Sequence, residues 1–462
     1  MTDSFSIITS LRKSANINSD FFYLINKLDL KSSLSRSYLH SLKFTTNRKE
    51  LQAEFDKIEE TISLLDDKKN AKIFSDTEHA LSQILDINGT LQNLEKSIVL
   101  NDIELFEIKK FAILADVIRQ LLSPFGLIDL PDFTEVINIL DPEKTRIRAF
   151  YIYDAYSAEL AELRKSMNNN IKNSSAEIYN KIVEFEDEIR KKLTVELTVY
   201  AHDLLIALKK VAYLDLLIAK AKQAVEYFFC KPVISENSMS YKGLFNPQLK
   251  DVLNGENKEY QSIDISFGKY PTLITGINMG GKTVLLKTLA LAQNFCQYGF
   301  YVPAKSAEIC LVNKIMISIT DEQNHLQGLS SFAAEMKNMN EILSEIATKK
   351  PLLVLIDELA RTTNPSEGRA IVSAALDTLS ENHVCSFITT HYDKIISDCR
   401  RLRVRGFADD MEIKSEKNIQ QYIDYSLVEE SETNVPHEAI RIAEILGVDS
   451  KFIEKTKEKL LM

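Results

Sequence analysis

The stretch TLITGINMGGKTVLLKTLALA, residues 272–292, decides the fold of the C-terminal half of this chain. It contains the pattern GxxxxGK[ST], which begins at Gly276 and ends with Gly281, Lys282 and Thr283. An apolar run precedes the pattern and an apolar helical run follows it, as a phosphate-binding (Walker A) loop requires. In such a loop the backbone N–H groups and the dipole of the following helix bind phosphate oxygens. The stretch therefore predicts a nucleotide site.

The residues of this loop have separate predicted roles. Lys282 is expected to reach the β- and γ-phosphates of ATP, and the hydroxyl of Thr283 is expected to bind Mg²⁺. The other predicted nucleotide-binding residues are Gly276, Asn278, Met279, Gly280, Gly281 and Val284. On this motif alone, a chance glycine-rich turn is the alternative interpretation.

Two later apolar runs also end on polar residues. The run LLVLIDEL ends on Asp357, which suits the Mg²⁺ shell, and Glu358, which suits orienting or deprotonating a water molecule. The run CSFITTHYD ends on Thr389, Thr390 and His391. Because ligands of open α/β sheets bind beyond the carboxyl ends of the strands, these ends predict one crevice, with Lys282, Glu358 and His391 as catalytic residues. The alternative for His391 is a histidine satisfied inside the core.

The rest of the sequence predicts a multidomain protein. The chain has 462 residues, of which 45% are hydrophobic and 26% are charged, as is typical of globular proteins. Apolar residues recur at helical spacing from about 45 to 125 and again from about 151 to 225, where a polar turn near 168–175 interrupts them. After residue 231, strand-like runs alternate with helical stretches, which indicates a mainly parallel sheet covered on both faces. We therefore expect an all-α N-terminal region followed by an α/β P-loop NTPase domain.

Charge and cysteine content restrict partners and compartment. The net charge of −10 provides no global basic field for nucleic acid, although a local patch could still bind it. One basic run holds Arg400, Arg401, Arg403 and Arg405, and its alternation also suits an exposed strand face. The five cysteines share no CxxC spacing, which favours buried thiols in a reducing compartment. Without a long apolar run or a signal peptide, we expect a cytoplasmic protein with no membrane partner.

Five elements in this order resemble the ATPase domain of the MutS mismatch-repair family. They are TGINMGGKT at 275–283, VPA at 302–304, SSF at 330–332, DE at 357–358 and THY at 390–392. The resemblance implies an ABC-like ATPase that uses ATP and Mg²⁺ and works as a homodimer. It also implies that Ser330 reaches the nucleotide of the opposite subunit, although a serine before a helix can be only a cap.

The resemblance extends more weakly over the remaining chain and suggests four domains. These are a helical core-like domain at 1–147, a lever hairpin at 148–230, the P-loop ATPase domain at 231–425 and a small helical dimerisation motif at 426–462. Core-like sequence begins by about residue 30, and only the polar turn stands where the family has its DNA clamp. We therefore expect neither a mismatch-reading domain nor a clamp.

One segment departs from the family pattern. The stretch ARTTNPSEG at 360–368 stands where the family has GRGTSTxDG, so Ala360 and Thr362 replace glycines. This stretch of sequence is similar to that of clamp-less MutS-like ATPases associated with cobalamin-dependent lysine and ornithine aminomutases.

Three functional hypotheses follow. The first is a dimeric ATP switch that remodels or reactivates a protein partner such as an aminomutase. The alternative is a DNA-binding MutS-like ATPase of repair or recombination, which would bind DNA without mismatch specificity. The third is an inactive nucleotide-binding scaffold, against which the intact Lys282, Thr283, Asp357 and Glu358 argue.

Overall fold

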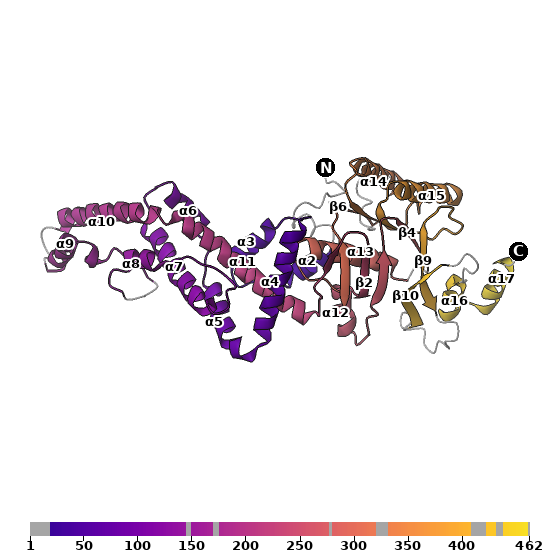
Figure 1. The fold of residues 1–462 in the computed structure, drawn as a ribbon, viewed down its shortest axis with the longest axis horizontal. Helices are drawn as coiled ribbons and strands as arrows, with labels where there is room; N and C mark the ends of the chain where they lie inside the picture. Colours follow the sequence, from indigo (N-terminus) through magenta and orange to yellow (C-terminus); the bar gives the residue numbers. More distant parts are fainter. Residues whose placement is uncertain are drawn as a thin grey trace. The chain divides into compact units, whose positions relative to one another are not determined.

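The chain divides by its contacts into two compact units. The computed structural model describes residues 19–144, 149–169, 175–276, 280–319, 331–407, 422–430 and 438–460. Unit 1 comprises residues 1–28, 42–56 and 223–462, and unit 2 comprises residues 29–41 and 57–222. The expected multidomain chain of helices and mixed α/β sheets is confirmed (Figure 1).

The described part of unit 2 is built from helices. They are α3 (Ser33–Ser41), the later part of α4 (Arg48–Asp66), η1 (Lys68–Asn70), α5 (Ala71–Ser82), α6 (Asn88–Glu95), α7 (Asp102–Leu122), α8 (Thr134–Leu140), η2 (Asp154–Tyr156), α9 (Ala158–Asn169), α10 (Ser175–Thr198) and most of α11 (Ala201–Glu226). The central helix α7 starts at a capping box, in which the Asn101 side chain accepts from the Glu104 N–H and the Glu104 carboxylate accepts from the Asn101 N–H. Its buried face packs against α5 and α8. No helix in the described ranges is long and apolar enough to cross a membrane.

The second helical stretch differs from its sequence-based expectation. Instead of one continuous helix to Val225, α10 ends at Thr198 and α11 begins at Ala201. Residues 194–199 read TVELTV, and β-branched residues are weak helix formers. The hydroxyls of Thr194 and Thr198 also bond the carbonyls four residues earlier, a contact that often bends helices. The predicted polar turn falls largely on residues 170–174, outside the described ranges.

A buried ion pair ties α7 to the chain before α9. The Lys109 ammonium donates to Asp141 Oδ1 at 3.1 Å, to the Ala149 carbonyl at 3.1 Å and to the Tyr153 hydroxyl at 2.7 Å. The two charged side chains are 0% and 1% exposed. A buried charge is tolerated when it is paired and hydrogen-bonded, as here.

The described residues of unit 1 form two sheets. The first has four strands in the order β1 (Val233–Ser235), β5 (Ser306–Cys310), β2 (Met239–Leu244) and β3 (Ile263–Phe267). The second has six strands in the order β10 (Ile423–Glu429), β9 (Arg400–Phe407), β4 (Pro271–Thr275), β8 (Cys385–Thr389), β7 (Leu352–Ile356) and β6 (Lys314–Ser318). All neighbours in the larger sheet are parallel except β9 and β10. The strand-like runs of the sequence at 262–267, 271–276, 314–319, 352–357 and 385–390 form β3, β4, β6, β7 and β8, as predicted.

Helices cover both faces of the larger sheet. Within the described ranges, the helices of unit 1 are α2 (Ser19–Asn26), the first part of α4, the end of α11, α12 (Pro247–Gly255), α13 (Lys282–Gln297), α14 (Ser331–Ile346), α15 (Pro365–Glu381), α16 (Glu438–Ile445) and α17 (Ser450–Leu460). On β7, the alternate residues Leu352, Val354 and Ile356 join a core with α14 and α15. The residues between them, Leu353 and Leu355, are also buried, and α13 packs against β7 and β8. A strand buried on both faces explains the unbroken apolar run LLVLI.

The strand order brings the predicted site residues to one edge of this sheet. β8 lies between β4 and β7, and all three strands run parallel. Their carboxyl ends therefore lie side by side. The phosphate loop, the two acids and the Thr389–His391 segment each follow one of these ends.

Candidate functional site

The phosphate loop connects β4 to α13. Gly276 has φ 129° and Gly281 has φ 73°, in a region of backbone conformation that favours glycine. Gly281 is the residue directly before α13, and Gly280 precedes it. Asn278 and Met279, both predicted to bind nucleotide, lie outside the described residues.

Lys282 spans the loop. Its ammonium donates to the Gly276 carbonyl at 2.7 Å, and the residue is 5% exposed. Because Lys282 is the first residue of α13, its charge adds to the positive end of the helix dipole. The loop, the helix terminus and the ammonium together suit an anion such as a phosphate group.

Asp357, which directly follows β7, is hydrogen-bonded to residues of α13, β6 and β8. Its two carboxylate oxygens accept from the Thr283 hydroxyl at 2.6 Å and from the Thr389 hydroxyl at 2.5 Å. The Thr389 oxygen in turn accepts from the Glu358 N–H at 2.9 Å, and the Asp357 N–H donates to the Ser318 carbonyl at 2.8 Å. Residues from α13, β6, β7 and β8 are thus linked within one hydrogen-bond network.

The donor atoms of this network suit a Mg²⁺ ion. The Thr283 hydroxyl and the Asp357 carboxylate are hard oxygen ligands, and they already lie within hydrogen-bond distance of each other. Within the described residues, no group of three or more His, Cys, Asp or Glu side chains could hold a metal ion. Mg²⁺ does not need one, because it is usually bound by one or two carboxylates together with waters and substrate phosphates.

Glu358 lies next to Asp357, and both residues are partly exposed to solvent. Its carboxylate accepts from the Arg361 guanidinium at 2.9 Å, and its side chain is 18% exposed. The residue adopts φ 49°, which is uncommon for a side chain with a Cβ. A partly exposed carboxylate can contact a water molecule, which is compatible with the predicted role of Glu358 in hydrolysis. That role stays a prediction.

Ala360 also adopts the left-handed conformation, with φ 61°. Its N–H donates to the Glu335 carboxylate at 2.9 Å, and its carbonyl accepts from the Tyr392 hydroxyl at 2.7 Å. The sequence raised the question of an alanine in place of a glycine here. The backbone conformation shows that the position would suit glycine.

His391 and Ser330 have different outcomes. His391 directly follows β8 and Thr390, and its side chain is exposed, so the alternative of a core histidine is wrong. Its ring centroid lies 4.3 Å from that of Tyr392. Its role as a sensor stays a prediction.

Ser330 lies outside the described residues, directly before α14.

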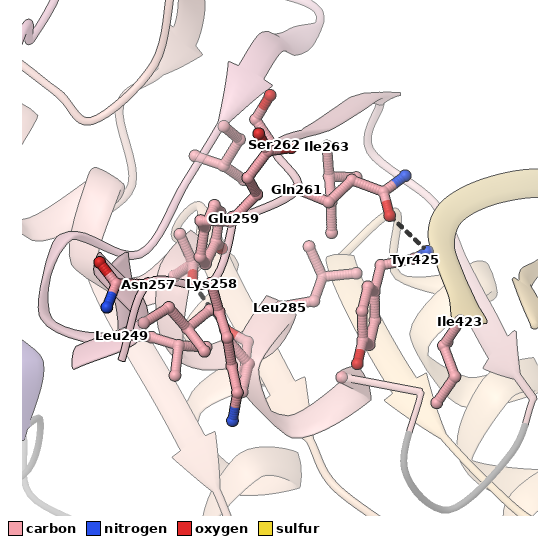
Figure 2. A pocket seen from close by; sticks show the side chains of 16 residues that line it. Leu249, Asn257, Lys258, Glu259, Gln261, Ser262, Ile263, Leu285, Ile423 and Tyr425 are labelled. Atoms are coloured by element: carbon pink, nitrogen blue, oxygen red, sulfur yellow. Dashed lines mark hydrogen bonds between the residues drawn. The ribbon is translucent and has the colours of Figure 1, made fainter. Parts of the chain in front are cut away.

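A pocket of about 930 Å³ opens beside the phosphate loop (Figure 2). Val284 and Leu285 of α13 line one side, and Ile423 and Tyr425 of β10 line another. A Cβ placed on Gly281 would lie 3.2 Å from Tyr425 Cδ1, so the tyrosine ring lies against the last glycine of the loop. The remaining lining residues are Leu244, Leu249, Leu253, Thr288 and residues 257–263.

Hydrogen bonds position the aromatic wall of this pocket. The Gln261 side chain accepts from the Tyr425 N–H at 2.9 Å and donates to Asp424 at 2.7 Å. Burial raises the pKa of Tyr425, so its hydroxyl stays protonated at neutral pH.

The sequence analysis assigned no role to four residues of this region, which are Gln261, Glu335, Tyr392 and Tyr425. Of these, only Tyr392 lies within a quoted motif. Gln261 and Tyr425 meet the phosphate loop only through the fold, because no local pattern marks them. Glu335 did have a signal. It is an acidic residue within the apolar stripe of α14 that contains Phe332, Met336 and Met339.

Comparisons with known proteins agree with this location. Residues 272–462 match the family described as MutS domain V. The chain is 37% identical over 218 residues to "Endonuclease MutS2" of Ligilactobacillus salivarius, covering 45% of this chain and 26% of that protein. It is 38% identical over 240 residues to the protein of the same name from Fusobacterium nucleatum, covering 48% and 29%. With that of Shouchella clausii it shares 30% identity over 302 residues, covering 63% and 35%. The matches thus span about a quarter to a third of these relatives.

Proposed function

Because the match to MutS domain V and the relatives named MutS2 both support the MutS family, we propose that this chain is a Mg²⁺-dependent ATPase that acts on DNA. MutS domain V is an ATPase domain. The observation that carries the proposal is the meeting of Lys282, Thr283 and Asp357 at neighbouring strand ends. The P-loop ATPase fold and the all-α N-terminal region, at the predicted boundaries, are part of the same proposal.

Each residue of the site has a proposed task. Lys282 and the N–H groups at the start of α13 bind the phosphates. Thr283 and Asp357 would hold Mg²⁺, which would neutralise charge on the phosphate oxygens. Glu358 orients a water molecule and accepts its proton. The pocket beside Gly281 takes the nucleoside, with the Tyr425 ring as a stacking surface. His391 is proposed as a polar sensor of the phosphates.

The comparisons favour DNA over an aminomutase as the partner. The aminomutase-associated branch and an aminomutase partner receive no support from them, whereas the relatives are named endonucleases, that is, enzymes that cleave nucleic acid. The proposal does not include the nuclease activity in those names, because this chain matches only about a quarter to a third of each relative. We also propose a homodimer in which Ser330 completes the site of the opposite subunit.

The arginine run of β9 is a poor candidate for the DNA contact. Arg400 pairs with Glu429 at 2.5 Å, and Arg405 pairs with Asp424 at 3.3 Å. Arg401 donates to the Ile395 carbonyl at 2.5 Å. Guanidinium groups already engaged in this way contribute less to a basic track for phosphates.

ATP turnover tests the first half of the proposal. Lys282→Ala should abolish Mg²⁺-dependent hydrolysis and weaken nucleotide binding, because the loop loses its charge toward the phosphates. Lys269→Ala removes an exposed lysine before β4 and is the matched control. Phosphate release and binding of a fluorescent ATP analogue measure the two effects. Hydrolysis that persists in Lys282→Ala would show that the loop is not the site.

DNA binding tests the second half. Fluorescence anisotropy on matched and mismatched duplexes should give equal affinities, because affinity that rests on contacts to phosphates does not depend on the bases. If roughly six or more phosphates are contacted, the affinity should fall by orders of magnitude between about 50 and about 200 mM salt. Tighter binding to the mismatch, or no binding at about 50 mM salt, would refute this half and leave the ATPase proposal standing.

A further inference from the structure

The turn that follows the two acids has an unusual backbone. Glu358 has φ 49° and Ala360 has φ 61°, so two residues with a Cβ, separated only by Leu359, adopt the left-handed conformation. For such residues this conformation is unfavourable, and it persists only where the surroundings hold it. The turn therefore needs partners outside itself.

Side chains from two other elements supply these partners. Glu335 of α14 accepts from the Ala360 N–H at 2.9 Å, and Tyr392, which follows β8, donates its hydroxyl to the Ala360 carbonyl at 2.7 Å. Thr389 accepts from the Glu358 N–H at 2.9 Å. Glu335 and Tyr392 are each 7% exposed, and Thr389 is fully buried. Both backbone polar groups of Ala360 are thus bound by buried side chains.

The position of the Tyr392 ring depends on a glycine in α15. A Cβ on Gly368 would lie 2.4 Å from the Tyr392 hydroxyl oxygen and 2.5 Å from Cζ, which is too close for any side chain. Only glycine at this position leaves room for the ring. The hydroxyl can therefore reach Ala360 because α15 has no side chain at that point.

We propose that Glu335 and Tyr392 are positioning residues that hold the Glu358 carboxylate in place by clamping Ala360. This inference rests on the proposed ATPase function. If the clamp is released, Ala360 can return to a right-handed conformation, which rotates the turn that carries Glu358. A displacement of about 1 Å at a reacting group can cost roughly a hundredfold in rate. Because the phosphate contacts of Lys282 are unaffected, the clamp sets turnover and leaves nucleotide affinity unchanged.

Amide hydrogen exchange without nucleotide tests the clamp directly. In the full-length wild-type protein, the Ala360 N–H should exchange slowly because it is bound to a buried carboxylate. Glu335→Leu should increase its exchange rate, and so should Tyr392→Phe, which removes a single oxygen and keeps the ring in place. Asn340→Leu on the exposed side of α14 and Tyr270→Phe are the matched controls and should leave the rate unchanged.

Steady-state ATPase kinetics test its consequence. Glu335→Leu and Tyr392→Phe should lower kcat by roughly tenfold and leave KM for ATP unchanged. The factor follows from the free-energy cost of the left-handed conformation for alanine. Glu335→Gln, whose amide oxygen still accepts a hydrogen bond, should keep most of the turnover.

Adding Ala360→Gly to Tyr392→Phe separates positioning from packing. Glycine adopts the left-handed conformation without help, so turnover should return toward the wild-type value. A lost packing contact would not be restored by this change. Failure of the rescue, or unchanged exchange in both clamp variants, would overturn the proposal. A wild-type protein without ATP hydrolysis would refute the proposed function instead, and the exchange experiment would still decide whether the clamp exists.

Discussion

Two aspartates inside the fold, Asp141 in unit 2 and Asp357 in unit 1, have opposite environments. Asp141 is 1% exposed and lies 3.1 Å from the Lys109 ammonium, so its charge is neutralised within the protein. Asp357 is less buried, and its carboxylate oxygens accept from the uncharged hydroxyls of Thr283 and Thr389. A carboxylate that is paired inside the protein makes the fold depend on its partner, because loss of the partner leaves a buried charge. One held by neutral donors at a strand end keeps its charge available for a cation.

Breaking the buried ion pair of Lys109 and Asp141 should have the largest effect on stability. Lys109→Ala leaves the Asp141 carboxylate buried without its ammonium, which should lower the free energy of unfolding by about 3–5 kcal/mol. The combined change Lys109→Met with Asp141→Leu should recover most of this loss, because an apolar pair of similar volume avoids the buried charge. Urea denaturation followed by circular dichroism measures both. A loss of less than about 1 kcal/mol in Lys109→Ala would show that the pair is not sealed from water.

Asp357→Asn should affect turnover and leave stability almost unchanged. The amide oxygen still accepts a hydrogen bond, but the charge toward Mg²⁺ is lost, so ATP hydrolysis should fall on the order of a hundredfold. Titration of hydrolysis with Mg²⁺, together with the urea midpoint, separates the two effects. Asp393→Asn changes an exposed aspartate nearby and is the control. Equal turnover of Asp357→Asn and wild type at all Mg²⁺ concentrations would remove the contrast between the two aspartates.

Glu335 should give the smallest effect. Burial raises its pKa above the ordinary value of 4.5, while the Ala360 N–H and the Arg361 charge lower it to a lesser extent. The Glu335 carboxyl therefore loses its proton at lower pH in the unfolded chain than in the folded protein. As the pH rises above about 4.5, ionisation of Glu335 lowers the stability of the folded protein.

The variant Glu335→Gln has no such cost. Relative to wild type, it should be more stable at about pH 7 than at about pH 4, as measured by urea denaturation at both pH values. A relative stability that falls between about pH 4 and about pH 7 would mean that the Glu335 carboxylate is stabilised in its ionised form.

The site was more predictable than the helical unit because its signals are local. The loop motif, the acids after an apolar run and the polar end of β8 each occupy a few consecutive residues. A parallel sheet then places the strand ends together. In unit 2, by contrast, Lys109 is one lysine in a helical pattern, and Asp141 and Tyr153 meet it only through packing. Nothing in their sequence neighbourhood marks a buried pair.

Other features were missed because they depend on competition between weak preferences. The break between α10 and α11 needs only a few β-branched residues, whose effect is small against a long helical pattern. Of the four-stranded sheet, the sequence indicated only β3, since short strands of mixed polarity resemble loops. The resemblance identified Ala360 as an unusual residue, but the partners that hold its backbone come from two distant segments.

The contact between Gly368 and the Tyr392 ring links two positions in the history of the sequence. A side chain at 368 has no room while the ring is present, and a small residue at 392 removes the reason for glycine. Single changes at 368 are therefore expected to be selected against, whereas paired changes at the two positions can persist. In a library that randomises both codons, survivors with an aromatic residue at 392 should carry glycine at 368. The two codons are then expected to co-vary as one inherited unit.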